Sequence, residues 1–233
     1  MATRPPFRCC DADRACLEYD GLDAQSDLRR WRSGELNAAT RELIEVVGRN
    51  GVDGARLLDI GAGVGAVHVA FLEAGAQSAV DVDASRDYLA VARTEAERRG
   101  LADRIDYRYG DAVELASDLP PADIVTLDSV ICCYRHLEPL LAAATRSRPR
   151  LLGLTYPRDV WWMRSFMRMY NAIAVVRRSP ARYFIHRHAQ VERWTAAAGY
   201  ERIHEGGPRP WRVVVYRRLA DAGADRRETA PAP

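Results

Sequence analysis

The chain of 233 residues contains no lysine, so all 34 of its basic residues are arginine. We attribute this absence to genomic base composition. Because 32 acidic residues nearly balance the arginines, the net charge is only +2. A balance of this kind gives no argument for a nucleic-acid partner, which a strongly basic surface would indicate.

Other features are also missing. The five cysteines form two adjacent pairs plus Cys16, a spacing unlike that of a secreted disulfide framework, and MATRPPF at the start lacks the apolar core of a signal peptide. We therefore expect a reducing, cytoplasmic setting. No run of about 18 apolar residues occurs, so we expect no transmembrane segment. The length, with 48% hydrophobic and 28% charged residues, favours one α/β domain.

The most informative stretch is LLDIGAGVGAV at 57–67. Its apolar part suits a buried parallel strand, and alternate glycines then permit a sharp turn into a helix and a close ligand approach. A helix that starts there directs free N–H groups at the ligand. The stretch also satisfies the loose dinucleotide fingerprint, so by itself it leaves a nicotinamide or flavin enzyme and other nucleotide binders open.

Three later strands are expected at 78–82, 105–108 and 124–127, and an aspartate follows each of them: Asp83, Asp111 and Asp128. The carboxyl ends of parallel strands share one edge of a sheet, and doubly wound folds bind ligands at that edge. The pattern therefore predicts a ligand site there, with a carboxylate beside the ribose of a bound nucleoside.

The remaining pattern predicts a helix over 27–49, a strand at 151–156, an apolar helix over 159–176, a short strand near 184–186 and a helix over 189–198. Strands at 200–205 and 211–217 should close the sheet as a hairpin. We thus predict an α/β doubly wound, Rossmann-like sheet of seven mostly parallel strands with a C-terminal antiparallel hairpin. The expected organisation is an arm and capping helix (1–50), the main domain with a lid helix near 159–178 (51–219) and a disordered tail (220–233).

Taken together, these motifs resemble the class I S-adenosylmethionine-dependent methyltransferases. The glycine motif of that family, an acidic residue followed by x-Gly-x-Gly-x-Gly, stands here at 59–65, and its later motifs match the aspartates at the strand ends. The resemblance implies S-adenosyl-L-methionine as cofactor, bound by Asp59, Gly61, Ala62, Gly63, Gly65, Asp83, Ala84, Asp111, Ala112, Asp128 and Ser129.

In this resemblance the glycine turn lies against the methionine part of the cofactor. Asp59 and the carbonyl of Asp128 face its ammonium, Asp83 accepts from both ribose hydroxyls, and Asp111 accepts from the adenine amino group. A weaker resemblance points to the magnesium-protoporphyrin O-methyltransferase branch. It rests on GVG in the glycine turn, on Tyr19, Arg30 and Trp31 before the domain, and on LDSVICCYRH after the fourth strand; the substrate side departs from that branch.

Methyl transfer requires the nucleophile, the methyl group and the sulfur to be held in line. A phenol or alcohol acceptor also needs a base, whereas a carboxylate needs none. His136 and Tyr134 follow the fourth strand, where substrate and cofactor meet in the family, so they are the catalytic candidates. His136 could be that base, or a structural histidine at a helix start.

The candidates for substrate binding follow the fifth strand: Tyr156, Arg158, Trp162, Phe166 and His186. The helix near 160–176 is apolar over much of its surface, which leaves three interpretations open: core packing, a substrate lid, or a homodimer or transient membrane-surface contact. His186 and His188 lack the further ligands that a metal site needs, so we expect no metal.

The sequence therefore predicts a methyltransferase that acts on a small-molecule acceptor without nucleic acid. The expected reaction is O-methylation of an apolar or aromatic hydroxyl or carboxylate. Two alternatives stay open at this point: a nucleotide-dependent Rossmann oxidoreductase and a non-catalytic protein that binds S-adenosylmethionine.

Overall fold

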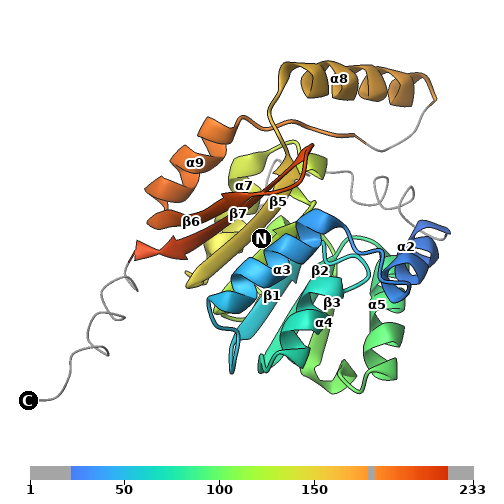
Figure 1. Ribbon diagram of the computed structural model, residues 1–233, viewed down its shortest axis with the longest axis vertical. Helices are drawn as coiled ribbons and strands as arrows, with labels where there is room; N and C mark the ends of the chain where they lie inside the picture. The colour runs from blue at the N-terminus through green and yellow to red at the C-terminus, as the bar shows by residue number, and fades with distance from the viewer. Residues whose placement is uncertain (1–21, 178–181, 220–233) are drawn as a thin grey trace, which may run out of the picture.

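A seven-stranded sheet runs through the computed structural model, which describes residues 22–177 and 182–219 (Figure 1). The strand order is β3-β2-β1-β4-β5-β7-β6. The first five strands pair in parallel, and β7 runs antiparallel to both β5 and β6. This arrangement confirms the predicted fold class. The strands are β1 (Arg56–Ile60), β2 (Ser78–Asp83), β3 (Ile105–Tyr109), β4 (Ile124–Asp128), β5 (Leu151–Pro157), β6 (Tyr200–Gly206) and β7 (Trp211–Arg218).

Helices cover both faces of the sheet. Apolar side chains of α3, α4 and α5 pack on one face, whereas α6, α7 and α9 cover the other (Figure 1). Because the central strands are buried on both faces, their sequences are nearly continuous apolar runs, and all seven residues of β5 are buried. The helices are α2 (Leu22–Arg32), α3 (Ala38–Arg49), α4 (Ala66–Glu73), α5 (Arg86–Arg98), α6 (Ala112–Leu115), α7 (Leu137–Thr145), α8 (Trp161–Val176) and α9 (His188–Ala197), with short 3-10 turns η1 (Ala102–Arg104) and η2 (Ile131–Cys133).

Two predicted elements differ from the structure. The expected helix over 27–49 is two helices, because Gly34 adopts a φ of 84° just after α2 and Asn37 caps the start of α3 by accepting a hydrogen bond from Ala39 N. The expected strand at 184–186 is irregular chain. A backbone hydrogen bond of 2.7 Å from Phe184 N to the carbonyl oxygen of Cys132 holds it against the segment after β4.

A row of polar side chains crosses the buried interior of the sheet. Tyr107, Asp81, Asp59 and Thr126 are register neighbours on β3, β2, β1 and β4. Asp59 accepts from Thr126 at 2.7 Å and lies 3.1 Å from the Nδ1 atom of His68 on α4. Both oxygens of Asp81 lack a hydrogen-bond partner among the described residues. The row lies one or two residues before the carboxyl ends of these strands.

The predicted arm at 1–20, with Cys9, Cys10 and Cys16, and the predicted tail at 220–233 lie outside the described residues. Within the described part of the chain, none of the helices combines the length and apolar character needed to cross a bilayer.

Candidate functional site

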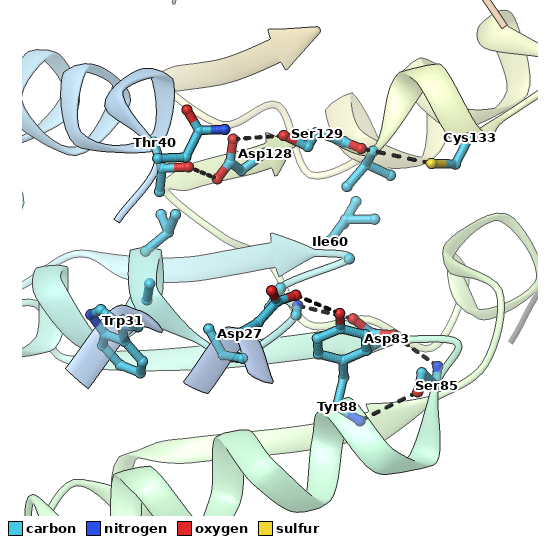
Figure 2. A pocket seen from close by; sticks show the side chains of 18 of the residues that line it. Asp27, Trp31, Thr40, Ile60, Asp83, Ser85, Tyr88, Asp128, Ser129 and Cys133 are labelled. Carbon is cyan, nitrogen blue, oxygen red and sulfur yellow. Dashed lines mark hydrogen bonds between the residues drawn. The ribbon is translucent and has the colours of Figure 1, made fainter. Parts of the chain in front are cut away.

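A cavity of about 960 Å³ opens at the carboxyl edge of the parallel strands. Its floor consists of the residues at and just after the ends of β1, β2, β3 and β4, and its far wall is the segment from α2 to the start of α3. Figure 2 shows side chains from both parts turned toward the same space. This is the edge at which the strand-end aspartates were predicted to meet.

The turn after β1 has a backbone that requires glycine. Gly61 and Gly65 have φ angles of 65° and 85°, a region that residues with a Cβ atom rarely adopt. A Cβ atom on Gly61 would lie 2.5 Å from Cγ2 of Val130, and one on Gly65 would lie 2.7 Å from Nε2 of His68. The turn is therefore packed from below by side chains, while its backbone faces the cavity.

Asp83 joins this turn to the end of β2. Its Oδ2 accepts from Gly63 N at 3.0 Å, and its Oδ1 accepts from Ser85 N at 2.8 Å. Burial raises the pKa of Asp83 to about 6, although the backbone hydrogen bonds from Ser85 and Gly63 act in the opposite direction. The carboxylate is thus fixed at the cavity wall, where Figure 2 shows it beside Ser85.

Asp111 and Asp128 also line the cavity. Asp111 caps α6 by accepting from Val113 N at 2.8 Å, and it accepts a second hydrogen bond from the hydroxyl of Tyr134. Asp128 accepts from the hydroxyl groups of Thr40, at 2.5 Å, and Thr155. Burial raises the pKa of Asp128, and these hydrogen bonds oppose that effect.

Most of the predicted cofactor residues come together here. Asp59 and Gly65 do not line the cavity. The other nine do: Gly61, Ala62, Gly63, Asp83, Ala84, Asp111, Ala112, Asp128 and Ser129. Asp59 is only 1% exposed and lies beneath the turn, between His68 and Thr126. Its contacts in the structure support the turn from below.

The residues of the far wall were not predicted as site residues. Arg30 and Trp31 were noted only as part of the weaker family resemblance. The wall consists of Asp27, Arg30, Trp31, Gly34, Glu35, Leu36, Asn37, Thr40 and Arg41. Asp27 accepts from the hydroxyl of Tyr88 at 2.7 Å, which ties α2 to α5 across the cavity (Figure 2). The break between two helices, marked by Gly34 and the capping Asn37, was the available sequence signal for this wall.

The two catalytic candidates have different positions. Tyr134 lines the cavity and donates to Asp111. His136 is half-buried at the N-cap of α7 and is not among the cavity-lining residues. The structure therefore brings Tyr134, but not His136, to the predicted site.

None of the predicted substrate residues lines this cavity. Tyr156 is buried in the core, where its hydroxyl accepts from Arg212 at 2.5 Å, and Arg158 donates to the carbonyl oxygens of Gly206 and Gly207. Trp162 and Phe166 are exposed on α8.

His186, the last of these candidates, lies outside the cavity as well. Its Nε2 atom is 2.7 Å from the carbonyl oxygen of Tyr134, to which it donates. Burial lowers the pKa of His186. Its contact therefore fixes the backbone of the segment after β4, and the predicted roles of these five residues remain untested.

Comparisons with known proteins agree with the resemblance to methyltransferases that the sequence indicated. Residues 57–151 match the methyltransferase domain family. The ribosomal protein L11 methyltransferase of Haemophilus influenzae (strain PittEE) is 34% identical over 86 residues, which cover 37% of this chain and 28% of that protein. The corresponding protein of Escherichia coli (strain 55989 / EAEC) is 31% identical over 44% of this chain and 33% of its own length. The chain thus spans about a third or less of these relatives.

Solved structures share the fold over most of the chain. Magnesium protoporphyrin IX methyltransferase from Synechocystis PCC 6803, solved with bound S-adenosylmethionine, is 16% identical with a TM-score of 0.65, over 93% of this chain and all of that one. The [4+2]-cyclase SpnF is 17% identical with a TM-score of 0.66, over 91% of this chain and 97% of that one. Because a cyclase has the same fold, the fold alone does not define the reaction.

Proposed function

We propose that this chain, which contains a class I S-adenosylmethionine-dependent methyltransferase domain, transfers a methyl group to an oxygen atom of a small apolar or aromatic molecule. The cofactor of that domain is S-adenosylmethionine, as the sequence predicted. One observation carries the proposal: a single cavity joins the strand-end aspartates to an open wall made by α2 and α3. Such a cavity has room for two ligands in contact, since about 960 Å³ is near the upper end of the usual range for ligand pockets.

The residues in the cofactor half of the cavity fit S-adenosylmethionine. Gly61 and Gly63 present backbone at positive φ angles that a Cβ atom would strain, and Asp83 offers a carboxylate that backbone N–H groups hold in place. In our proposal Asp83 binds the ribose hydroxyls and Asp111 the adenine amino group. When bound, the cofactor supplies a methyl group on a positively charged sulfur.

The acceptor half is assigned to the wall between α2 and α3. Trp31 and Leu36, together with Val130 opposite them, give it an apolar lining, while Arg30 and Arg41 bring guanidinium groups to its rim. Thr40 fixes this wall to the floor through its hydrogen bond to Asp128. The task of these residues is to hold the acceptor oxygen in line with the methyl group and to keep water out.

Among acceptors that are methylated at oxygen, we favour a carboxylate over a hydroxyl. A hydroxyl must lose a proton to a base, and the candidate base, His136, is not part of the cavity lining. A carboxylate is already charged at neutral pH and matches the guanidinium groups of Arg41 and of Arg30, the latter lying 3.7 Å from Glu35 in the structure. The magnesium protoporphyrin IX methyltransferase fold neighbour also supports a small-molecule acceptor. The partial match to ribosomal protein methyltransferases carries no information on the acceptor.

Calorimetry tests the cofactor half. We expect Asp83→Ala to weaken binding of S-adenosylmethionine by about 10- to 100-fold, because two hydrogen bonds to a charged group are lost. The matched control is Asp106→Ala, since Asp106 is exposed on β3 and pairs with Arg108 outside the cavity. Unchanged affinity in Asp83→Ala, or nicotinamide or flavin absorbance in the purified protein, would refute the assignment.

A thermal-shift screen in the presence of S-adenosylhomocysteine tests the acceptor half. We expect aromatic carboxylic acids to raise the melting temperature more than the corresponding alcohols, and Trp31→Ala to abolish this second shift. The shift produced by S-adenosylhomocysteine itself should persist in Trp31→Ala. For an acid acceptor, His136→Asn should keep full turnover; a loss of turnover there, or a preference for alcohols, would instead favour base catalysis.

A further inference from the structure

Helix α8 stands apart from the body of the protein. Figure 1 shows it above the carboxyl edge of the sheet, where it follows β5 in the chain. Of its 16 residues only Met163 and Ala174 are buried. Its remaining tertiary contacts are few: Asn171 exchanges two hydrogen bonds with the backbone of Tyr183, and the Tyr170 ring packs edge-on against that of Tyr183.

The exposed side of α8 is apolar along its whole length. Five large residues follow one another at spacings of four, three, four and three, which places them on one face of the helix. Their exposed fractions run from 46% at Ile173 to 83% at Val176. We call this set the α8 stripe: Trp162, Phe166, Met169, Ile173 and Val176. A continuous apolar face of this kind indicates a binding surface.

The charge of the same region has one sign. From Val160 to Val191 the sequence contains six arginines and no acidic residue. Arg168 and Arg177 are exposed on α8, and Arg164 pairs with Asp159, which lies just before the helix. Within the described part of the chain, the apolar stripe is therefore accompanied by exposed positive charge at Arg168 and Arg177.

The apolar stripe and the nearby arginines together discriminate between two possible partners of α8, a second copy of the chain and a membrane surface. A second copy of the chain would place arginines against arginines with no acidic residue to receive them, which opposes pairing through α8. Anionic lipid headgroups have the complementary charge. Tryptophan at an interface, as at Trp161 and Trp162, and arginine with its long apolar stem both suit the boundary between headgroups and acyl chains.

We propose that α8 docks on the surface of a membrane that contains anionic lipids, with the α8 stripe facing the acyl chains. The helix would lie in the plane of the interface, where its length of about 24 Å needs no spanning segment. Because β5 leads into α8 from the sheet edge that carries the cavity, docking brings that edge to the lipid side. The proposal does not depend on the methyl-transfer reaction.

Vesicle flotation with the full chain tests this surface. The probes are vesicles of phosphatidylcholine alone and vesicles with about one third phosphatidylserine. We expect binding to the anionic vesicles only, with weaker binding at high salt because the charges are then screened. Brominated lipid in the anionic vesicles should quench tryptophan fluorescence, since Trp162 would enter the interface.

Two substitutions on α8 form a matched pair. Ile173 and Val175 are both exposed β-branched residues, but only Ile173 belongs to the stripe. We expect Ile173→Gln to weaken partitioning about tenfold, as loss of one buried apolar side chain implies, and Val175→Gln to have little effect. Arg168→Gln should weaken it about fivefold. Circular dichroism checks that each variant remains folded.

Three results would overturn the proposal. The first is no binding to anionic vesicles, and the second is equal binding to neutral ones. The third is a dimer in light scattering that Ile173→Gln dissociates, because the occupant of the stripe would then be a second copy of this chain. Calorimetry with S-adenosylmethionine on the same variants should show unchanged affinity, which separates this outcome from any failure of the cofactor assignment.

Discussion

Asp81 and Asp83 show how position within one strand decides the chemistry of a carboxyl group. They lie two residues apart on β2, so they share a face of the sheet. Asp83, at the strand end, receives backbone N–H groups and opens on the cavity. Asp81 is 0% exposed, and neither of its oxygens has a partner among the described residues. Burial, and then the charges of Asp83 and Asp59, raise the pKa of Asp81 well above its usual range.

We predict that Asp81→Asn stabilises the protein at alkaline pH. Because the folded pKa of Asp81 is raised, its contribution to stability is complete below the unfolded pKa of about 3.9 and is lost as pH rises toward the folded value. The amide cannot ionise, so it avoids this loss. At pH 8 we expect the free energy of unfolding, measured by urea denaturation, to be higher in Asp81→Asn than in the wild type.

The gain should disappear at about pH 3 and below, where Asp81 is protonated in both the folded and the unfolded state. Asp106→Asn is the control on exposed carboxylates of the same sheet, and it should change the free energy of unfolding by less than about 0.5 kcal/mol at either pH. A loss of stability in Asp81→Asn at pH 8 would show that the carboxylate is ionised and compensated in the folded protein.

At the level of single residues, the sequence predicts the floor of the cavity because the spacing of strand ends and glycines is local information. It does not place Asp59, whose side chain meets His68 from α4 and Thr126 from β4. Nor does it separate Tyr156, which is buried by Arg212 from β7, from a residue that reaches the cavity. Both cases depend on long-range packing, which no local pattern encodes.

At the level of elements, α2 is held in place by polar contacts as well as by the apolar cluster of Ala24, Leu28 and Val91. Glu95 on α5 has a fully buried side chain and receives guanidinium groups from Arg32 of α2 and from Arg98 and Arg99 of its own helix. These groups, Arg98 first, lower the pKa of Glu95 to about 2, although burial acts in the opposite direction. Arg99 also lies 4.7 Å above the Trp31 ring. Glu95 therefore links α2, which carries part of the proposed acceptor wall, to α5.

We predict that Glu95→Gln lowers the free energy of unfolding by about 2 kcal/mol at neutral pH, because the arginines lose a shared anion and must be hydrated again. The lowered pKa means that this stability is present above the unfolded value and is lost as pH falls toward about 2. Limited proteolysis should also cleave near residue 33 faster in the variant than in the wild type.

Glu97→Gln is the matched control, since Glu97 is an exposed carboxylate on the same helix. It should leave both the unfolding free energy and the proteolysis rate close to the wild-type values. If Glu95→Gln behaved in the same way as Glu97→Gln, α2 would be held by its other contacts, for example the packing of Leu28 and the hydrogen bond from Tyr88 to Asp27.

The elements that the sequence predicts correctly are those with strong periodicity and clear ends, such as β1, β2 and the closing hairpin. The prediction of a single helix over 27–49 was wrong because the apolar residues on both sides of Gly34 keep a helical spacing through the break. The prediction of a strand near 184–186 was wrong because this short apolar run packs on the segment after β4 and does not join the sheet. Short apolar runs do not separate these outcomes.

At the level of the whole molecule, the cavity joins parts that are far apart in the sequence. The floor comes from the sheet edge formed by the ends of β3, β2, β1 and β4, and the wall comes from the segment before the domain. The two are linked by Thr40 to Asp128 and by Asp27 to Tyr88. A ligand bound on the floor should therefore stabilise the wall, while α8, with few contacts to either part, should be unaffected.

Hydrogen exchange measured by mass spectrometry can test this linkage. A ligand present at about 100 times its dissociation constant adds about 2.7 kcal/mol to the free energy of unfolding, which slows exchange through opening of its site about 100-fold. With S-adenosylhomocysteine we expect this protection in the turn at 60–66 and, to a smaller degree, in α2 and α3, but not in α8. Protection confined to the turn would show that the wall moves independently of the cofactor half. Protection of α8 would mean that the helix closes over the bound ligand, as expected of a lid.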